Sequence, residues 1–152
     1  MRRLAIATLT VTVAMTLAAC GGGSSSGTSS SPTANPASAK AEIAHAYTTF
    51  FSSSIPVAKT LLQDGASLSA AFVIANRLKG NAKESAKVHS VTLTGPTTAD
   101  VKYELDTNGN PVLANADGKA VYVNGHWLVA KATFCQLVGL AQPGKPVKGC
   151  TS

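Results

Sequence analysis

The chain has 152 residues, of which 45% are hydrophobic, 5% aromatic and 13% charged. This length suits one folded domain, and the hydrophobic fraction excludes a disordered polyelectrolyte. The 13 Lys and Arg residues outnumber the 7 Asp and Glu residues. The basic residues are interleaved with acids along the chain and form no stripe with aromatic residues, so we expect no nucleic-acid surface.

Residues 1–19 are predicted to be a signal peptide. Arg2 and Arg3 precede an apolar run, Leu4 to Ala19, that only threonines interrupt. The run is shorter than the roughly 20 apolar residues of a typical membrane span, and it ends in small residues that suit a signal peptidase. The segment Leu17-Ala18-Ala19-Cys20 resembles a bacterial lipobox, whose cysteine is acylated with chains such as palmitate. The sequence therefore predicts a lipoprotein anchored through Cys20 to the extracytoplasmic face of the cell membrane.

Residues 20–39 are predicted to be the lipidated cysteine and a flexible tether. After Cys20 they contain only Gly, Ser, Thr, Pro, Ala and Asn, with no charge and no large apolar side chain. Such a segment buries too little surface to offset the entropy of ordering it. As a random coil it spans roughly 25 Å, which lets the domain stand off the membrane. Without Arg2 and Arg3, eleven basic residues remain against seven acidic ones, a net charge of +4.

The two remaining cysteines, Cys135 and Cys150, are expected to form a disulfide. They enclose 14 residues, and closing such a loop stabilises a fold by about 3 kcal/mol. The bridge would tie the tail, residues 142–152, to the expected last strand. A redox or metal pair would need a closer spacing or a neighbouring histidine. The three histidines have no ligand spacing either, so we expect no metal and no cofactor.

Helical periodicity dominates the first half of the domain. The segment 39–54 places Ile43, Tyr47, Phe50 and Phe51 on one helical face, with Ser38 as the expected N-cap. A short turn is expected over 57–62, and a third helix between Ser67 and Gly80. The apolar positions of that third helix are Leu68, Ala71, Phe72, Ala75 and Leu78.

After Gly80 the apolar period changes to two, which indicates strands. We expect His89, Val91 and Leu93 to share one face of a first strand. The next strand alternates Ala99, Val101, Tyr103 and Leu105 with Asp100, Lys102, Glu104 and Asp106. The predicted turn dipeptides are Asn108-Gly109, Asp117-Gly118 and Asn124-Gly125. Together these patterns predict an α+β domain over 40–141, with N-terminal helices packed on a curved antiparallel sheet.

A family resemblance runs through the whole predicted domain. It is carried by the segments Leu61-Leu62-Gln63-Asp64-Gly65, Val101-Lys102-Tyr103, Gly109-Asn110-Pro111-Val112-Leu113, Gly118-Lys119-Ala120-Val121, Gly125-His126-Trp127-Leu128-Val129 and Thr133-Phe134-Cys135. These segments make residues 40–141 similar to the carboxyl-terminal domain of the low-molecular-weight secreted antigens of mycobacteria and related actinobacteria. The resemblance implies a cone-shaped fold of the cystatin or nuclear transport factor two-like kind. It implies no activity, because the members of the family have none assigned. The lipobox departs from members that are simply secreted.

The implied cone encloses a pocket that isomerases and dehydratases use, with an inward acid or histidine and a tyrosine. His89 and Tyr103 are the candidates here, but the acids of the neighbouring strand alternate outward, so no catalytic set is visible. Aromatic residues at helical or strand spacing fill either the core or an apolar pocket. With His89 and Tyr103, the possible pocket residues are Tyr47, Phe51, Phe72 and Trp127.

The leading functional hypothesis is therefore a non-catalytic, lipid-anchored envelope protein that binds a small apolar ligand or a membrane or envelope protein partner. An isomerase-like or dehydratase-like enzyme that uses His89 and Tyr103 is the alternative. A domain that recognises the envelope through its sheet surface is a third reading. The sequence leaves the ligand, the partner and the oligomeric state open.

Overall fold

The computed structural model describes residues 35–150, which contain four helices and four strands. The predicted signal peptide, Cys20 and most of the predicted tether lie outside these residues. In chain order the elements are α1 (Pro36–Ser52), α2 (Ile55–Thr60), α3 (Ser69–Lys79), β1 (Glu84–Leu93), β2 (Thr98–Thr107), β3 (Asn110–Val123), β4 (His126–Val129) and α4 (Lys131–Ala141). Within the described residues, no helix is long and apolar enough to cross a membrane.

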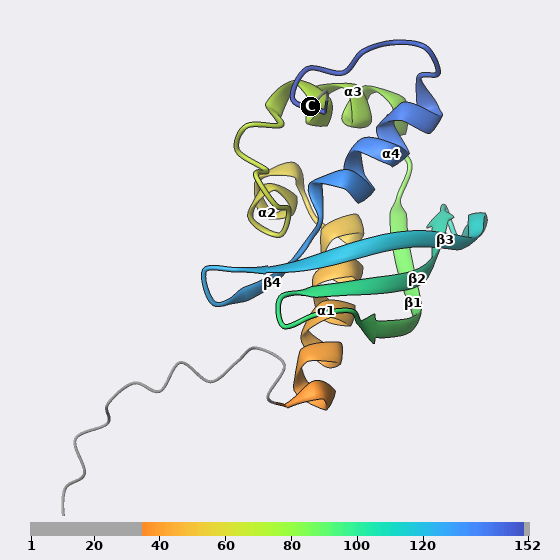
Figure 1. Cartoon of the computed structure of the whole chain (residues 1–152). Coiled ribbons are helices and arrows are strands. Elements are labelled where there is room, and N and C mark those ends of the chain that lie inside the picture. Colours follow the sequence, from red (N-terminus) through yellow and green to blue (C-terminus); the bar gives the residue numbers. More distant parts are fainter. Residues whose placement is uncertain (1–34, 151–152) are drawn as a thin grey trace, which may run out of the picture.

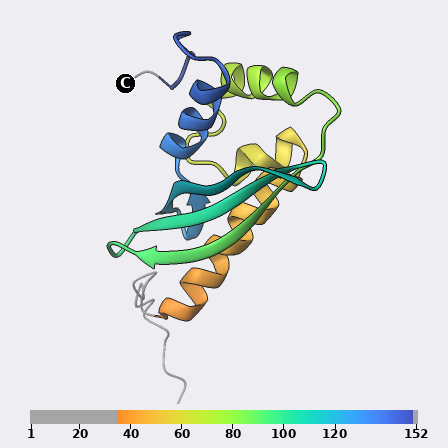
Figure 2. The same cartoon turned by 90° about the vertical axis from the view of Figure 1, so that its right-hand side faces the viewer.

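The strands form one antiparallel sheet in the order β1-β2-β3-β4, and the sheet curls around α1 (Figures 1 and 2). Helix α1 packs against β1 and β4, whereas α4 packs against α3 and β3. On β2 the four predicted inward residues are all buried. The predicted α+β class, with helices on a curved antiparallel sheet, is therefore confirmed.

Helix α1 begins earlier than the sequence pattern predicted. The N-cap is Asn35, whose Oδ1 accepts a hydrogen bond from the Ser38 backbone N–H at 3.2 Å, and Pro36 follows it. Proline suits the first helical position because that residue's N–H has no partner within the helix. The predicted N-cap Ser38 is therefore wrong. Residues 36–39, which composition assigned to the tether, form the first turn of the helix.

Two of the three predicted turns are confirmed. Asn108-Gly109 joins β2 to β3 and Asn124-Gly125 joins β3 to β4, and all four residues have positive φ. The third prediction is wrong, because Asp117-Gly118 lies inside β3, opposite residues 101 and 102 of β2. Gly118 lies there because the Tyr47 ring occupies the space that a side chain would need.

The structure joins Cys135 and Cys150 in the predicted disulfide, with the two Cα atoms 5.4 Å apart. Cys135, however, lies on helix α4 and not on the last strand as expected. Strand β4 ends at Val129, and Phe134 and Val138 then bury one face of α4. The tail that follows buries Val147. The disulfide thus ties the tail to a helix.

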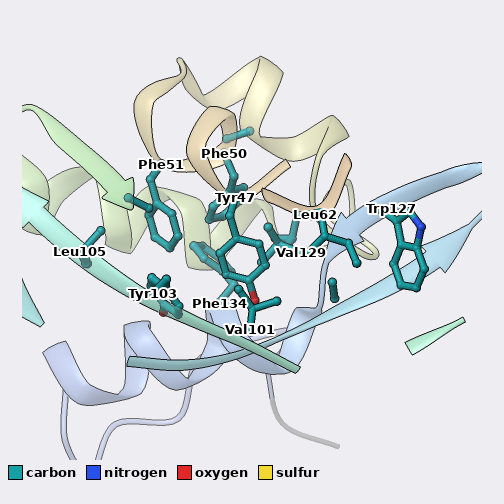
Figure 3. Close-up of a cluster of buried hydrophobic side chains, with 14 of the residues drawn as sticks. Tyr47, Phe50, Phe51, Leu62, Val101, Tyr103, Leu105, Trp127, Val129 and Phe134 are labelled. Carbon is teal, nitrogen blue, oxygen red and sulfur yellow. The ribbon is translucent and has the colours of Figure 1, made fainter. Parts of the chain in front are cut away.

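Aromatic rings fill the centre of the core (Figure 3). The Tyr47 ring lies 5.2 Å from the Tyr103 ring and 6.4 Å from the Phe51 ring, measured between centroids. Phe50 and Phe134, 5.9 Å apart, extend this cluster toward α4. The core therefore joins α1, the sheet and α4.

Candidate ligand-binding pocket

An apolar pocket of about 560 Å³ opens between α3, α4 and the β2–β3 hairpin, at the C-terminal end of α1. This volume lies in the range of roughly 300–1,000 Å³ that is usual for small-molecule sites. The apolar residues that line it are Phe50, Phe51, Ile55, Ala58, Phe72, Ala75, Leu78, Ala82, Leu105, Val112, Leu113, Phe134, Leu137, Val138, Leu140 and Ala141. We call it the apolar pocket.

The floor of the apolar pocket is made of aromatic rings from three helices. Phe50 comes from α1, Phe72 from α3 and Phe134 from α4, and each is about 5% exposed. The rings of Phe72 and Phe134 stack with their centroids 4.6 Å apart, and Phe50 meets both rings nearly edge-on. Such mutual packing restricts side-chain rotation. The floor is therefore a fixed apolar surface.

The remaining walls are aliphatic. Leu105 and Leu113 project from the β2–β3 hairpin, and Leu137 and Leu140 come from α4. Leu137 continues the spacing of three to four residues that starts at Phe134, so the helix turns both side chains to the pocket. An occupant would therefore meet hydrocarbon on most sides.

A few polar residues also line the apolar pocket. Ser53 and Ser54 follow α1, Lys79 ends α3, and Glu84 begins β1. Lys79 Nζ lies 3.4 Å from Glu84 Oε2. Asn76 and Thr107 complete the polar lining. A mostly apolar pocket with a few polar groups suits a molecule that is largely apolar and carries a polar group.

A second depression, of about 580 Å³, lies on the outer face of the sheet. Its charged residues pair with one another: Lys102 with Asp117, and Lys119 with Asp100, the latter at 2.8 Å. All four side chains are more than half exposed. Exposed ion pairs of this kind contribute little free energy and leave no charge free for a ligand. We therefore take the apolar pocket as the candidate site.

The structure places five of the six predicted pocket residues in three different surroundings. Phe51 and Phe72 line the apolar pocket. Tyr47 and Tyr103 lie in the core beneath the sheet, and the Tyr47 hydroxyl donates to the Lys119 carbonyl at 2.8 Å. Trp127 lies at the far end of the core from Phe51 (Figure 3), against Tyr122. Its indole Nε1 is buried without a hydrogen-bond partner among the described residues.

Burial keeps the two core tyrosines neutral. Desolvation raises the pKa of Tyr47 far above its ordinary value, and desolvation followed by repulsion from Asp117 raises the pKa of Tyr103 to about 12. Burial disfavours the phenolate because the low-polarity interior solvates charge poorly. Neither phenol loses its proton at physiological pH. In this geometry both rings pack in the core, and the Tyr47 hydroxyl also donates a hydrogen bond.

The prediction that His89 faces inward is wrong. The pairing of β1 with β2 shifts between Val88 and Ser90, so that His89 falls in a bulge. A bulge inserts one unpaired residue and changes which face the following side chains occupy. His89 is exposed, and its Nε2 lies 3.7 Å from Glu104 Oε2. Tyr103 faces the opposite side of the sheet, so the proposed catalytic pair does not meet.

Several lining residues were missed by sequence reasoning. Leu113, Leu137 and Leu140 line the apolar pocket, yet none was singled out. Leu137 and Leu140 follow Phe134 at helical spacing, which could have indicated them, but that segment was expected to be a strand.

The described residues, 35–150, hold no cluster of three or more His, Cys, Asp or Glu side chains able to bind a metal ion. Cys20 lies outside the described residues.

Comparison with known proteins identifies a family. The C-terminal domain of low molecular weight antigen MTB12 matches residues 35–145, nearly the whole described domain. The chain belongs to this family, as the resemblance predicted. Membership agrees with an extracellular or cell-envelope location. No curated protein and no solved structure was found to match the chain.

Proposed function

We propose that this member of the antigen family is anchored by lipid to the extracytoplasmic face of the cell membrane. There it binds a small apolar molecule without catalysing its conversion. The observation that carries the proposal is the apolar pocket of about 560 Å³, floored by the rings of Phe50, Phe72 and Phe134. Burying apolar ligand surface there contributes free energy in proportion to the area removed from water, about 25 cal/mol per Å². The pocket has the size and lining for such a ligand.

The polar lining supports binding more than catalysis. A general acid or base must reach the reacting atom and have a pKa near the working pH. The acid in the lining, Glu84, already pairs with Lys79. His89, the base of the alternative enzyme hypothesis, lies on the other face of the sheet from Tyr103. We therefore assign the polar lining residues to orienting the ligand.

The proposal is tested by native mass spectrometry of the chain from residue 21 onward, exported by and purified from an actinobacterial host. We expect a reproducible apolar adduct that can be identified after denaturation. Ala75 lies on the pocket side of α3, with Phe72 and Lys79 one turn away on either side. Ala75→Trp should fill the cavity and abolish the adduct, because the indole occupies the ligand's volume.

Ala70→Trp is the matched control, since Ala70 is exposed on the same helix and does not line the pocket. This variant should keep the adduct, and circular dichroism should show that both variants are folded. A protein from the actinobacterial host whose mass shows no adduct would contradict the binding proposal and favour recognition of an envelope protein. An adduct that survives Ala75→Trp would place the ligand elsewhere.

A further inference from the structure

Exposed apolar side chains gather at the mouth of the apolar pocket. Within residues 35–150 the exposed large hydrophobic residues are Val57, Val73, Leu78, Val112 and Leu140. Three of these five, Leu78, Val112 and Leu140, line the apolar pocket, and they are 48%, 55% and 63% exposed. We call these three residues the apolar rim. Clustered exposed apolar side chains mark interaction surfaces, whereas scattered ones do not.

The apolar rim is assembled from distant parts of the sequence. Leu78 lies near the end of α3, Val112 just after the β2–β3 turn, and Leu140 near the end of α4. These element ends gather on the right-hand side of Figure 1, the side that faces the viewer in Figure 2. The fold therefore brings three exposed apolar side chains to one opening.

Basic residues lie close in the sequence to residues of the apolar rim and of the pocket lining. Arg77 precedes Leu78, Lys83 lies between two residues of the lining, and Lys145 follows α4 closely; all three are exposed. The acid in the pocket lining, Glu84, is paired with Lys79. On the outer sheet face, by contrast, the lysines pair with aspartates. The segments that form the mouth thus combine apolar side chains with more basic residues (Arg77, Lys79, Lys83 and Lys145) than acidic ones (Glu84 and Asp106).

We propose that the apolar rim docks the mouth of the pocket on an anionic lipid bilayer, from which the pocket takes a ligand with an acyl chain. The ligand half of this inference rests on the proposed function. Apolar side chains enter the acyl boundary of a bilayer while neighbouring basic residues contact anionic headgroups. The charge pattern at the mouth matches that arrangement. The open pocket would then face the hydrocarbon that fits it.

The chain is long enough for both contacts with one membrane. Helix α1 has 17 residues, or about 25 Å at 1.5 Å per residue, and it ends at the pocket. Fully extended, the segment between Cys20 and Asn35 reaches at most about 50 Å. An anchor at Cys20 and a docked mouth can therefore engage the same bilayer.

Vesicle flotation tests the docking with the chain from residue 21 onward, which lacks the predicted anchor but keeps every described residue. The vesicles are phosphatidylcholine, with or without phosphatidylglycerol. We expect binding only when phosphatidylglycerol is present. Leu140→Glu or Val112→Glu should lower the partition coefficient at least about tenfold, because each removes an apolar contact and adds negative charge. Val73→Glu adds the same charge at an exposed valine outside the pocket and should bind nearly as the parent does.

Oleate uptake from solution, read by native mass spectrometry, separates the two proposals. Ala75→Trp should lose oleate yet still float with the vesicles. A parent protein that takes up oleate but does not float would overturn the docking and leave the pocket function intact. Flotation that depends on the rim without oleate uptake would sustain the docking and reject the pocket.

Two further results would overturn the docking. Equal losses for Leu140→Glu and Val73→Glu would reduce the binding to net charge. A concentration-dependent dimer in solution that Leu140→Glu dissociates would assign the rim to a second copy of the chain.

Discussion

Gly118 shows how one missing side chain sets the packing of the core. A Cβ at this position would overlap the Tyr47 hydroxyl and lie 3.0 Å from Tyr103 Cε1. The Tyr47 hydroxyl could not then reach the Lys119 carbonyl beside it. Both rings are buried on all sides, so neither can move away without disturbing α1. The constraint at residue 118 is therefore steric.

Gly118→Ala is expected to lower the free energy of unfolding by about 1–3 kcal/mol, as overpacking of a core usually does. Chemical denaturation measures the change. Gly139→Ala is the matched control, because a Cβ there meets nothing within 4 Å and α4 gains a better helix former. A Gly118→Ala variant as stable as the parent would show that the Tyr47 contact is not tight.

The raised pKa of Tyr103 should make the folded protein less stable at alkaline pH. Its pKa is raised to about 12 in the folded protein, mainly by burial, from an ordinary value near 10. Above pH 10 the unfolded chain therefore releases a proton that the folded chain retains, and folding loses stability as pH rises. Tyr103→Phe removes the ionisable phenol, so the variant should lose less stability than the parent between pH 9 and pH 11.

Denaturant midpoints at the two pH values give the comparison for Tyr103. Tyr122→Phe is the control, since Tyr122 is only half-buried against Trp127. Equal losses of stability in the parent and in Tyr103→Phe would contradict the raised pKa of Tyr103.

Tyr47→Phe should show the same reduced loss of stability at alkaline pH as Tyr103→Phe. It should also lower the free energy of unfolding by about 0.5–1.5 kcal/mol at neutral pH through the lost hydrogen bond.

Among the elements, α4 links the apolar pocket to the disulfide. It supplies the pocket with Phe134, Leu137 and Leu140, and it carries Cys135. The disulfide joins it to a tail in which Val147 is buried, and Gly149 of the tail lies close to Leu68. The tail therefore braces α4 against the segment before α3, next to the pocket.

Breaking the disulfide should destabilise the domain by about 3 kcal/mol, the estimate for a loop of about 15 residues. The double variant Cys135→Ser/Cys150→Ser and the reduced parent should show the same denaturation midpoint, below that of the oxidised parent. Reductant added to the double variant is the control and should change nothing. A reductant-insensitive parent would mean that the two cysteines are not bonded in solution.

The elements also show where sequence reasoning succeeds and fails. Strand β2 was predicted over residues 99–106 of its observed span Thr98–Thr107, because its alternation of apolar and polar residues is local. The bulge at His89 could not be predicted, since it depends on how β1 pairs with β2. Gly118 was read as a turn because Asp-Gly favours turns locally, whereas its real constraint is a ring from a helix some 70 residues earlier.

The pocket was predictable only in part for the same reason. Phe51 and Phe72 were singled out because aromatic residues at helical spacing stand out in a domain with few of them. Leu113 gave no such signal, because a half-buried leucine is common on any surface. Leu140 follows Phe134 at helical spacing, but that segment was expected to be a strand. Their significance appears only when the fold brings the β2–β3 hairpin and α4 to one opening.

At the scale of the whole molecule, the start of α1 and the apolar pocket lie at opposite ends of the described domain (Figure 1). Helix α1 begins at the end opposite α3 and the tail (Figure 1). The apolar pocket opens near the C-terminal end of α1. A chain anchored ahead of α1 would thus be held at one end of the domain and would present its ligand site at the other. Only a long segment before α1 could let that site return to the membrane.

The anchor itself is tested by Cys20→Ala. We expect this substitution to abolish labelling by a fatty-acid analogue and to release unprocessed or soluble protein, because the predicted acylation needs the cysteine sulfur. Two or more acyl chains hold a protein on a bilayer almost irreversibly, at about 0.8 kcal/mol per buried methylene. Membrane binding through a docked rim alone is weaker, so the released protein should wash off membranes in high salt, which screens its basic residues.

Acylation that persists in Cys20→Ala would disprove the anchor. Cys135→Ser/Cys150→Ser, which leaves Cys20 in place, should still be labelled and so controls for loss of a cysteine elsewhere.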